Sequence, residues 1–270
     1  MTNVKRLLIL GGTGDAAELA AKASVIEQIE VITSLAGRTR NPQAPTGMVR
    51  IGGFGGEVGL VEYLREAKID LLIDATHPFA AQISWNAANA ATSCNIPHLL
   101  FIRPPWLQVP GDEWIEVDSV EIAASVLPEF AKRVFLTIGR QQLAPFARLD
   151  SIWFLMRLID PPAADVLIPQ GMILCDRGPF VLDNERRLLI EHQIDTLVSK
   201  NSGGDATYAK IIAAREVGVK VVMVKRPPTP PGEKVSDVES AMQWLINQII
   251  QKAEGRRQKA EGNPPLKEWD

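Results

Sequence analysis

A glycine-rich turn near the start of the chain has the residue spacing of a phosphate-binding site. Residues 11–17 read Gly-Gly-Thr-Gly-Asp-Ala-Ala, and from Gly12 they fit G-x-G-x-x-A, the alanine-ended form of the dinucleotide-binding fingerprint. Gly12 permits a tight turn, Gly14 lets backbone N–H groups approach a pyrophosphate, and Ala17 allows a helix to pack closely on a strand. We therefore predict that Gly12, Thr13 and Gly14 bind phosphates at the positive end of a helix dipole; the alternative is an ordinary strand-to-helix turn.

The second predicted strand is followed by hydroxyl and guanidinium groups rather than by an acid. Folds specific for NAD place an acidic residue about twenty residues after the glycines, where it binds the ribose 2′-hydroxyl. Here no Asp or Glu occurs between Glu30 and Glu57, whereas Ser34 is followed by Arg38 and Arg40. Such groups suit a 2′-phosphate, so the pattern favours NADPH over NADH, with Ser34 and Arg38 as ligands. The alternative is that both arginines are solvated loop charges.

A second glycine turn, Gly52-Gly53-Phe54-Gly55-Gly56, follows the third predicted strand. Four glycines in five residues are unfavourable to order unless the backbone adopts unusual angles or approaches a ligand. We interpret Gly53, Phe54 and Gly55 as a backbone wall beside the cofactor, and the alternative is a mobile turn.

Polar residues also end the fourth predicted strand, in the sequence Asp74-Ala75-Thr76-His77-Pro78-Phe79. Ligands of doubly wound sheets gather at the carboxyl ends of strands, so Thr76 is predicted to contact the cofactor. His77 is a candidate catalytic residue because an imidazole can donate a hydrogen bond or move a proton near neutral pH. A structural histidine that caps the next helix is the alternative.

Short apolar runs alternate with segments of helical period, which is typical of parallel sheets covered by helices. The predicted strands are Lys5–Leu10, Glu30–Thr33, Met48–Ile51, Leu71–Asp74, His98–Ile102, Arg133–Ile138, Ile152–Arg157, Thr196–Ser199 and Val219–Val224. Residues 141–149 are among the segments predicted to be helical. The expected fold class is α/β, with two Rossmann-like domains, parallel sheets and a ligand cleft between the domains.

The alternation restarts after an irregular segment, and this restart sets the predicted domain boundaries. We predict an N-terminal NADP-binding Rossmann-like domain over residues 1–115 and a C-terminal α/β domain over residues 116–250. Residues 251–270 have too few apolar side chains to bury a core, so they are predicted to be a disordered tail.

The composition is that of a soluble globular enzyme, with 46% hydrophobic and 23% charged residues. A net charge of −3 argues against nucleic-acid binding, which needs a concentrated basic face. The two cysteines form no CxxC pair, so we expect no metal site and a reducing, cytoplasmic location. The uncharged stretch over residues 75–102 is interrupted by prolines and asparagines, so no membrane span is expected.

Several motifs together resemble the precorrin-6A reductase family, which includes the enzymes that act on cobalt-precorrin-6A. They are GGTG at 11–14, GGFGG at 52–56, DATHPFA at 74–80, RPPW at 103–106, IGRQ at 138–141, KNSGG at 200–204, TYAK at 207–210 and RP at 226–227. The resemblance covers about residues 4–250 in the expected order. DATHPFA and KNSGG are far more specific than the dinucleotide fingerprint.

The resemblance implies a reductase of cobalamin biosynthesis, which uses NADPH to reduce one macrocycle double bond of precorrin-6A or its cobalt form to the 6B form. Hydride would add to an electrophilic carbon of the conjugated ring, and the protein's main task would be orientation and electrostatics. The implied partner is a small tetrapyrrole, a corrinoid, and neighbouring enzymes of the corrin pathway are further candidate partners.

Because precorrins carry many carboxylates, we expect their binding site to offer cations and N–H donors. Arg140 follows a predicted strand and is a candidate for binding the substrate or the cofactor. Residues Lys200, Asn201, Ser202, Gly203 and Gly204 close another strand and open a helix, an arrangement that can receive an anion. The alternative for Lys200 and Ser202 is solvent contact and helix capping.

Three other functions are considered. A short-chain dehydrogenase needs a Tyr-x-x-x-Lys pair, but Tyr63 and Tyr208 are followed four positions later by Ala67 and Ile212. A non-enzymatic NADP-binding sensor would have no reason for a cation-bearing second half. A methyltransferase of the same pathway would not need a guanidinium group near the adenosine.

Overall fold

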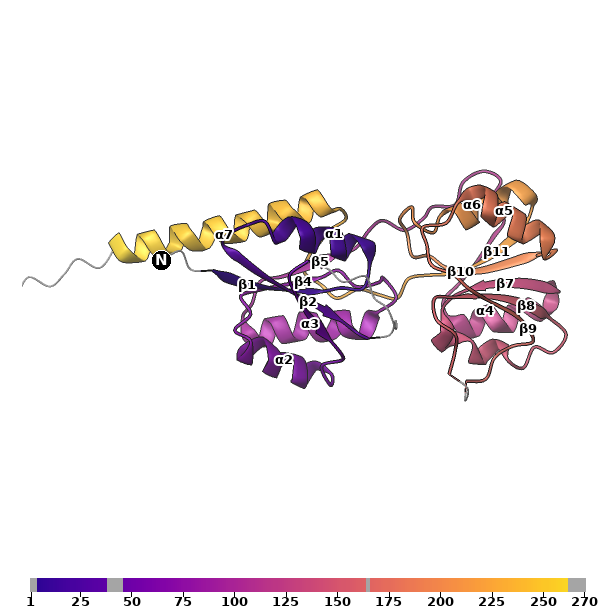
Figure 1. The fold of residues 1–270 in the computed structure, drawn as a ribbon, viewed down its shortest axis with the longest axis horizontal. Coiled ribbons are helices and arrows are strands. Elements are labelled where there is room, and N and C mark those ends of the chain that lie inside the picture. The colour runs from indigo at the N-terminus through magenta and orange to yellow at the C-terminus, as the bar shows by residue number, and fades with distance from the viewer. Residues whose placement is uncertain (1–3, 38–45, 164–165, 262–270) are drawn as a thin grey trace, which may run out of the picture. The chain divides into compact units, whose positions relative to one another are not determined.

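The computed structural model describes residues 4–37, 46–163 and 166–261, with side chains through residue 250. Two compact units separate within this part of the chain (Figure 1). The first contains the described residues up to Gly37, those from 46 to Ile102, and those from Pro230 onward. The second comprises the described residues of Arg103–Thr229.

The described residues of the first unit form a six-stranded sheet in which all neighbouring strands are parallel. Its strands are β1 (Lys5–Leu10), β2 (Ile29–Leu35), β3 (Met48–Ile51), β4 (Leu71–Asp74), β5 (His98–Phe101) and β12 (Glu233–Val235). The order β12-β5-β4-β1-β2-β3 proceeds outward from β1 in both directions, as in dinucleotide-binding folds.

Helices cover both faces of this sheet (Figure 1). Helices α1 (Gly14–Ala23) and α7 (Val238–Glu261) lie on one face, and α2 (Glu57–Glu66) and α3 (Ala81–Cys94) lie on the other. In β1, Leu7 and Ile9 belong to the core beneath α1 and α7, whereas Leu8 and Leu10 belong to the core beneath α2 and α3. Because both faces are buried, the strand is a continuous apolar run, which is why its bounds are predictable.

The described part of the second unit contains another six-stranded parallel sheet, with the order β6-β11-β10-β7-β8-β9. Its strands are β6 (Trp114–Val117), β7 (Arg133–Thr137), β8 (Trp153–Leu158), β9 (Gly171–Cys175), β10 (Thr196–Lys200) and β11 (Lys220–Val224). The order is equivalent to that of the first sheet, with β7 in the position of β1. The edge strand β6, however, comes from the chain that precedes β7.

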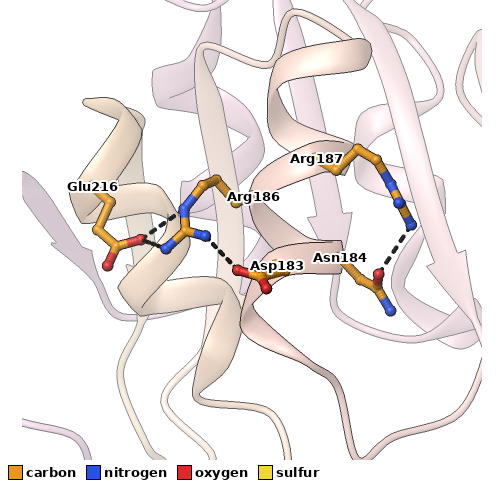
Figure 2. A network of polar contacts seen from close by, with 5 residues as sticks. All are labelled: Asp183, Asn184, Arg186, Arg187 and Glu216. Atoms are coloured by element: carbon orange, nitrogen blue, oxygen red, sulfur yellow. Dashed lines mark hydrogen bonds and ion pairs between the residues drawn. The ribbon is translucent and has the colours of Figure 1, made fainter.

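Helices α5 (Leu182–Glu191) and α6 (Ala209–Val217) cover one face of the second sheet, and α4 (Val120–Val126) covers the other (Figure 1). Figure 2 shows the exposed polar contacts that join α5 to α6. Arg186 donates from Nε to Glu216 at 3.0 Å and also pairs with Asp183. Leu189 and Ile211 pack in the core beneath the two helices, so polar contacts outside and apolar contacts inside hold the pair together.

The prediction of two α/β domains with parallel sheets is confirmed, but the domain boundaries differ from those predicted at residues 115 and 250. The change of unit falls between Ile102 and Arg103, because β6 pairs with β11 of the second sheet. From Pro230 the chain returns to the first unit, where β12 pairs with β5. Buried Lys5 of β1 also donates to the backbone oxygen of Gln248 in α7, at 2.6 Å.

Two predicted segments have a different structure. Helix α7 continues to Glu261 through residues 251–261, which were predicted to be disordered. These residues are rich in good helix formers, although they offer little to bury. The helix predicted over 141–149 is replaced by short 3-10 turns at Arg140–Gln142 and Ala144–Phe146.

Candidate functional site

The first sheet reverses its direction of winding between β1 and β4, and the loops after both strands lie at this switch point. Ligands of doubly wound folds bind outside the carboxyl ends of the strands at such a point. The loops are joined to neighbouring strands by backbone bonds, from Gly11 to the oxygen of Ser34 at 2.9 Å and from Ala75 to the oxygen of Leu10 at 2.9 Å. The first glycine turn and the Asp74–Phe79 segment are therefore brought to one edge of the sheet.

A different physical requirement explains why each of the three positions in the first turn carries a glycine. A Cβ at Gly11 would lie 3.1 Å from Cγ2 of Thr33, so close packing favours a glycine here. Gly12 has a φ of 109°, which side chains rarely tolerate. Gly14 has an ordinary φ, and a Cβ there would meet no atom within 4 Å. The backbone and the packing of this protein thus leave the glycine at position 14 unexplained, whereas a ligand at the start of α1 would explain it.

The hydroxyl of Thr13 is occupied within the protein. Its Oγ1 accepts a hydrogen bond from the backbone N–H of Ala16 at 3.1 Å and thereby caps α1. The same hydroxyl donates to the backbone oxygen of Ala75 at 2.9 Å, which joins the turn to the end of β4. A contribution of Thr13 to phosphate binding would therefore come from its backbone N–H.

The end of β4 contains a buried carboxylate with one uncommitted oxygen. Oδ1 of Asp74 accepts from both the backbone N–H and the hydroxyl of Thr76, at 3.0 and 2.7 Å. Oδ2 is buried and has no hydrogen-bond partner among the described residues. Burial lowers the pKa of nearby His98, and the charge of Asp74 opposes this shift. The hydroxyl of Thr76 is committed to Asp74, so it does not donate to a cofactor in this arrangement.

His77 is exposed and takes part in a local turn. Its Nδ1 accepts from the backbone N–H of Phe79 at 3.2 Å, but Ala80 is the N-cap of α3 and no side chain caps this helix, so His77 is not the helix cap of the structural alternative. The catalytic role of His77 stays a prediction.

The second glycine turn is shaped by positive φ angles at Gly52, Gly55 and Gly56 (126°, 79° and 94°). Gly53 resembles Gly14, because its φ is ordinary and a Cβ would meet nothing within 4 Å. Gly59 in α2, which the sequence analysis did not single out, lets the turn fold back, since a Cβ there would lie 1.8 Å from the oxygen of Phe54. The wall predicted beside the cofactor is therefore a defined turn packed on α2.

Arg50, in β3, organises this second turn and was also missed. Its Nη1 donates to the oxygen of Gly52 at 2.6 Å, and its Nη2 donates to the oxygen of Gly53 at 2.8 Å. The guanidinium carbon lies 3.9 Å from the ring centroid of Phe54 and 5.1 Å from that of Tyr63. A lone arginine in a short strand gives little sequence signal, because its partners become visible only once β3 is folded beside β2.

Among the described residues, the positively charged side chain that lies beside Ser34 is that of Arg50. The two residues are register partners of β2 and β3, and Nη1 of Arg50 lies 3.4 Å from Oγ of Ser34. Arg38 and Arg40, which were considered in the sequence analysis, lie outside the described residues. Binding of a 2′-phosphate by Ser34 and Arg38 stays a prediction.

In the second sheet the winding reverses between β7 and β10, so Arg140, which follows β7, and Lys200, the last residue of β10, lie at the same edge. Gly139 has a φ of 91°, and a Cβ there would meet nothing within 4 Å. Arg140 is half-buried, with Nη1 3.4 Å from the oxygen of Pro161. The predicted cationic residues of the second half are thus gathered at a second switch point.

The segment after Lys200 is held by Trp106. The Oδ1 of Asn201 accepts from the backbone N–H of Trp106 at 2.8 Å, and its Nδ2 donates to the backbone oxygen of Trp106 at 2.9 Å. The indole Nε1 donates to the oxygen of Gly204 at 2.9 Å. The side chain of Asn201, predicted to bind substrate, is therefore committed to the backbone.

Arg226 also holds the segment that follows Lys200. The RP motif at 226–227 does not by itself reveal this role. The guanidinium of Arg226 donates to the backbone oxygens of Asn201, Arg103, Pro104 and Ser202, at 2.8, 2.6, 3.1 and 2.9 Å. Burial, followed by the charge of Arg103, lowers the pKa of Arg226 to about 10. This arginine is a structural clamp.

Close neighbours explain both glycines of this segment. At Gly203 a Cβ would lie 2.1 Å from the oxygen of Pro104 and 2.4 Å from Nη2 of Arg226. At Gly204 it would lie 2.9 Å from Cδ of Arg103. Both residues have positive φ, 66° and 73°. Substrate binding through Lys200, Ser202 and these glycines stays a prediction. The segment that carries these residues is held in place by hydrogen bonds from Trp106 and Arg226.

A buried charged cluster lies on the α5 and α6 side of the second sheet. Arg157 donates to both carboxylate oxygens of Glu185, with Nη2–Oε2 at 2.9 Å, and its guanidinium lies 3.6 Å from the ring centroid of Phe180. Lys210 is 5% exposed, and its Nζ lies 5.5 Å from the ring centroid of Trp106. Burial and the charge of Arg157 lower the pKa of Lys210 to about 7, opposed by Glu185.

Over the described ranges, no helix is both long enough and apolar enough to cross a bilayer. Nor do three or more His, Cys, Asp or Glu side chains of those ranges gather as a metal site.

These features define an α/β protein with two doubly wound parallel sheets and a dinucleotide-type turn at the first switch point. Comparison with known proteins gives the family. The profile described as "Precorrin-6x reductase CbiJ/CobK" matches residues 6–246, and the chain belongs to this family of cobalamin biosynthesis.

Individual relatives agree with the family. The chain is 50% identical over 242 residues to "Precorrin-6A reductase" of Rhodococcus erythropolis, covering 89% of this chain and 97% of the relative. It is 29% identical over 257 residues to "Cobalt-precorrin-6A reductase" of Priestia megaterium, covering 90% and 98%. The solved structure "CobK precorrin-6A reductase" superposes with a TM-score of 0.85 at 40% identity, covering 91% of this chain and 97% of that one.

Proposed function

We propose that this protein uses NADPH to reduce one macrocycle double bond of precorrin-6A, giving precorrin-6B. Family membership supports the macrocycle and the reduction. The observation that carries the cofactor assignment is Gly14, whose missing side chain is explained neither by its φ nor by its packing. A pyrophosphate at the start of α1 would occupy that open space and accept hydrogen bonds from the first-turn N–H groups.

The described residues of the first unit fit NADPH in other respects. Backbone N–H groups of Gly12, Thr13 and Gly14 would bind the pyrophosphate. Ser34 is a predicted ligand of the 2′-phosphate, and the other predicted ligand, Arg38, lies outside the described residues. The turn of Gly53, Phe54 and Gly55 would line the cofactor, since position 53 is open in the same way as position 14.

At the second switch point we propose a site for the carboxylates of the macrocycle. Arg140 and Lys200 would supply positive charge, and Ser202 would supply its hydroxyl. Gly203 and Gly204 would contribute through their backbone N–H groups. Asn201 would position the segment, because its side chain binds Trp106 and its backbone N–H donates to the oxygen of Val224. The clamp of Arg226 would keep these donors fixed, which avoids an ordering cost when an anion binds.

When bound, NADPH supplies the hydride for the reduction. The residues of this chain bind and orient the reactants, and no side chain is assigned to proton transfer. The alternative functions, another NADP-dependent oxidoreductase, a sensor or a methyltransferase, have no feature here that favours them over the reductase.

Metal-free precorrin-6A is the proposed substrate, in preference to the cobalt form. The relative with that name is considerably more similar to this chain than the relative named for the cobalt form. The proposed location is the cytoplasm, because Cys94 and Cys175 are free thiols, as expected in a reducing compartment. Neighbouring enzymes of the corrin pathway stay candidate partners.

An anaerobic assay tests the proposed function. The purified protein is incubated with NADPH and either metal-free or cobalt-bearing precorrin-6A, and NADPH absorbance is followed. Oxidation that depends on the metal-free macrocycle is expected. NADPH binding without such oxidation would favour the sensor, and binding of S-adenosylmethionine in preference to NADPH would favour a methyltransferase.

A further inference from the structure

Arg50 occupies the position at which dinucleotide-binding folds select between cofactors. The discriminating group lies at the carboxyl end of the second strand, beside the ribose 2′ position. Here that strand is β2, and Ser34 near its end is paired in register with Arg50 of β3. A cation therefore stands beside the place where an NAD-specific fold carries an acid.

The guanidinium is held in a fixed orientation by contacts on several sides. Two carbonyl oxygens of the second glycine turn accept from Nη1 and Nη2, while the rings of Phe54 and Tyr63 lie against its face. Ser34 provides a further acceptor for Nη1. A preformed guanidinium loses little conformational entropy when an anion binds, which distinguishes it from a solvated loop arginine.

No carboxylate of the described residues neutralises the charge of Arg50. Its partners are carbonyl oxygens, a hydroxyl and aromatic rings, and it forms no ion pair with any described carboxylate. Its Nε and the second hydrogen of Nη2 have no hydrogen-bond acceptor among the described residues. Donors and charge therefore remain for an anionic ligand, with the geometry that suits a phosphate.

The exposure of the two partners decides which of them a ligand can reach. Ser34 is only 5% exposed, whereas Arg50 is half-buried and its bond from Nη2 lies at the surface. Direct contact therefore falls to the guanidinium, and Ser34 orients it.

We propose that Arg50 determines the preference for NADPH by binding the 2′-phosphate, while the same side chain holds the turn that lines the cofactor. This inference rests on the proposed function, since it concerns the same cofactor. It places the ligand of the 2′-phosphate in β3, at Arg50, whereas the sequence predicts this ligand at Arg38.

The test measures equilibrium dissociation constants, not activity, for the full chain. Wild type, Arg50→Met, Arg50→Lys and the control Arg65→Met, an exposed arginine in α2, are titrated with NADPH and NADH. Adenosine 2′,5′-bisphosphate and adenosine 5′-monophosphate serve as probes of the 2′-phosphate alone. Circular dichroism confirms that each variant is folded, and Arg50→Lys, which keeps the charge, provides a second reading if Arg50→Met is unstable.

We expect Arg50→Met to weaken NADPH and the bisphosphate by about 10- to 100-fold, as for a lost charge-assisted bond. NADH and the monophosphate should lose much less, Arg50→Lys should lie between, and Arg65→Met should match wild type. Equal losses for NADPH and NADH would overturn the specificity role and leave only a role in shaping the turn. Wild type that binds neither nucleotide, or does not prefer NADPH, would instead overturn the cofactor assignment on which the inference rests.

Discussion

Asn201 and Trp106 are joined by a pair of hydrogen bonds in which a side-chain amide takes the place of a neighbouring strand. The amide accepts from the backbone N–H of Trp106 at 2.8 Å and donates to its backbone oxygen at 2.9 Å. Because Asn201 follows β10 directly, this pair sets where the proposed anion-binding segment leaves the second sheet. The residue thus acts through position, not through contact with a ligand.

Replacing Asn201 tests this structural role. Asn201→Ala should lower the free energy of unfolding by about 1–3 kcal/mol, because two backbone groups of Trp106 lose their partners in a buried site. Asn201→Asp should also destabilise, since a carboxylate oxygen would face the carbonyl that now accepts from Nδ2. Urea denaturation checks both, and unchanged midpoints would contradict the role assigned here.

Gly203→Ala should destabilise the protein considerably more than Gly218→Ala. The two glycines have similar positive φ, 66° and 72°, so a left-handed alanine costs about 1–2 kcal/mol at either position. Only at Gly203 would the new Cβ collide with the oxygen of Pro104, at 2.1 Å, whereas at Gly218 it would meet nothing within 4 Å. Equal losses of unfolding free energy would show that the close approach does not matter.

Gly14→Ala should separate folding from cofactor binding. The added methyl meets no protein atom, and alanine is a better helix former than glycine, so thermal stability should be unchanged or slightly raised. NADPH affinity should fall at least about tenfold, because the methyl occupies the space proposed for the pyrophosphate. Fluorescence titration gives the affinity, and an unaltered dissociation constant would remove the phosphates from this turn.

Lys210 should make stability depend on pH in a defined window. Its pKa is about 7 in the folded protein against 10.5 unfolded, so between these values the unfolded chain binds more protons. The free energy of unfolding therefore gains a contribution that rises as the pH increases from about 7 to 10.5, and below about 7 this slope ends. Lys210→Met should flatten that part of the profile.

The control for this measurement is Lys132→Met, at an exposed position. Urea denaturation over the pH series should give the wild-type slope for the control and a smaller slope for Lys210→Met. Identical slopes for all three proteins would mean that Lys210 is not buried as described.

The sequence predicts the first sheet well, from the buried strands β1 and β4 to the exposed edge strand β3. Strands β1, β3 and β4 have the predicted bounds, and Gly12 and Gly14 fall at the switch point where the fingerprint places them. The edge strands β6, β9 and β12 were missed. For β6 and β12, and for the return of the chain to the first unit, the reason is that pairing across more than 100 residues has no local signal.

The site was predicted less completely than the fold, for a related reason. Thr13, Thr76 and Asn201 are predicted ligand contacts because of the glycine turn, the strand end and the KNSGG motif in which they occur, yet their side chains are occupied by backbone or neighbouring groups. Arg50 was missed because its importance depends on Ser34, which becomes its neighbour only in the sheet.

Arg140→Ala and Lys200→Ala test the proposed carboxylate site. Each should raise KM for the macrocycle by about tenfold, as expected for loss of one charged hydrogen bond, with little effect on NADPH affinity. Lys132→Ala, at the opposite end of β7, is the matched control. Wild-type kinetics in both variants would move the substrate away from the second switch point.

Single-turnover stoichiometry measures whether reduction of the macrocycle consumes NADPH. Under anaerobic conditions, enzyme, NADPH and metal-free precorrin-6A are mixed, and nucleotide oxidation and macrocycle absorbance are recorded together. One NADPH should be oxidised for each macrocycle reduced, with far slower reduction by NADH. Macrocycle reduction without nucleotide oxidation, or no reaction of a folded protein that binds both compounds, would contradict the proposed function.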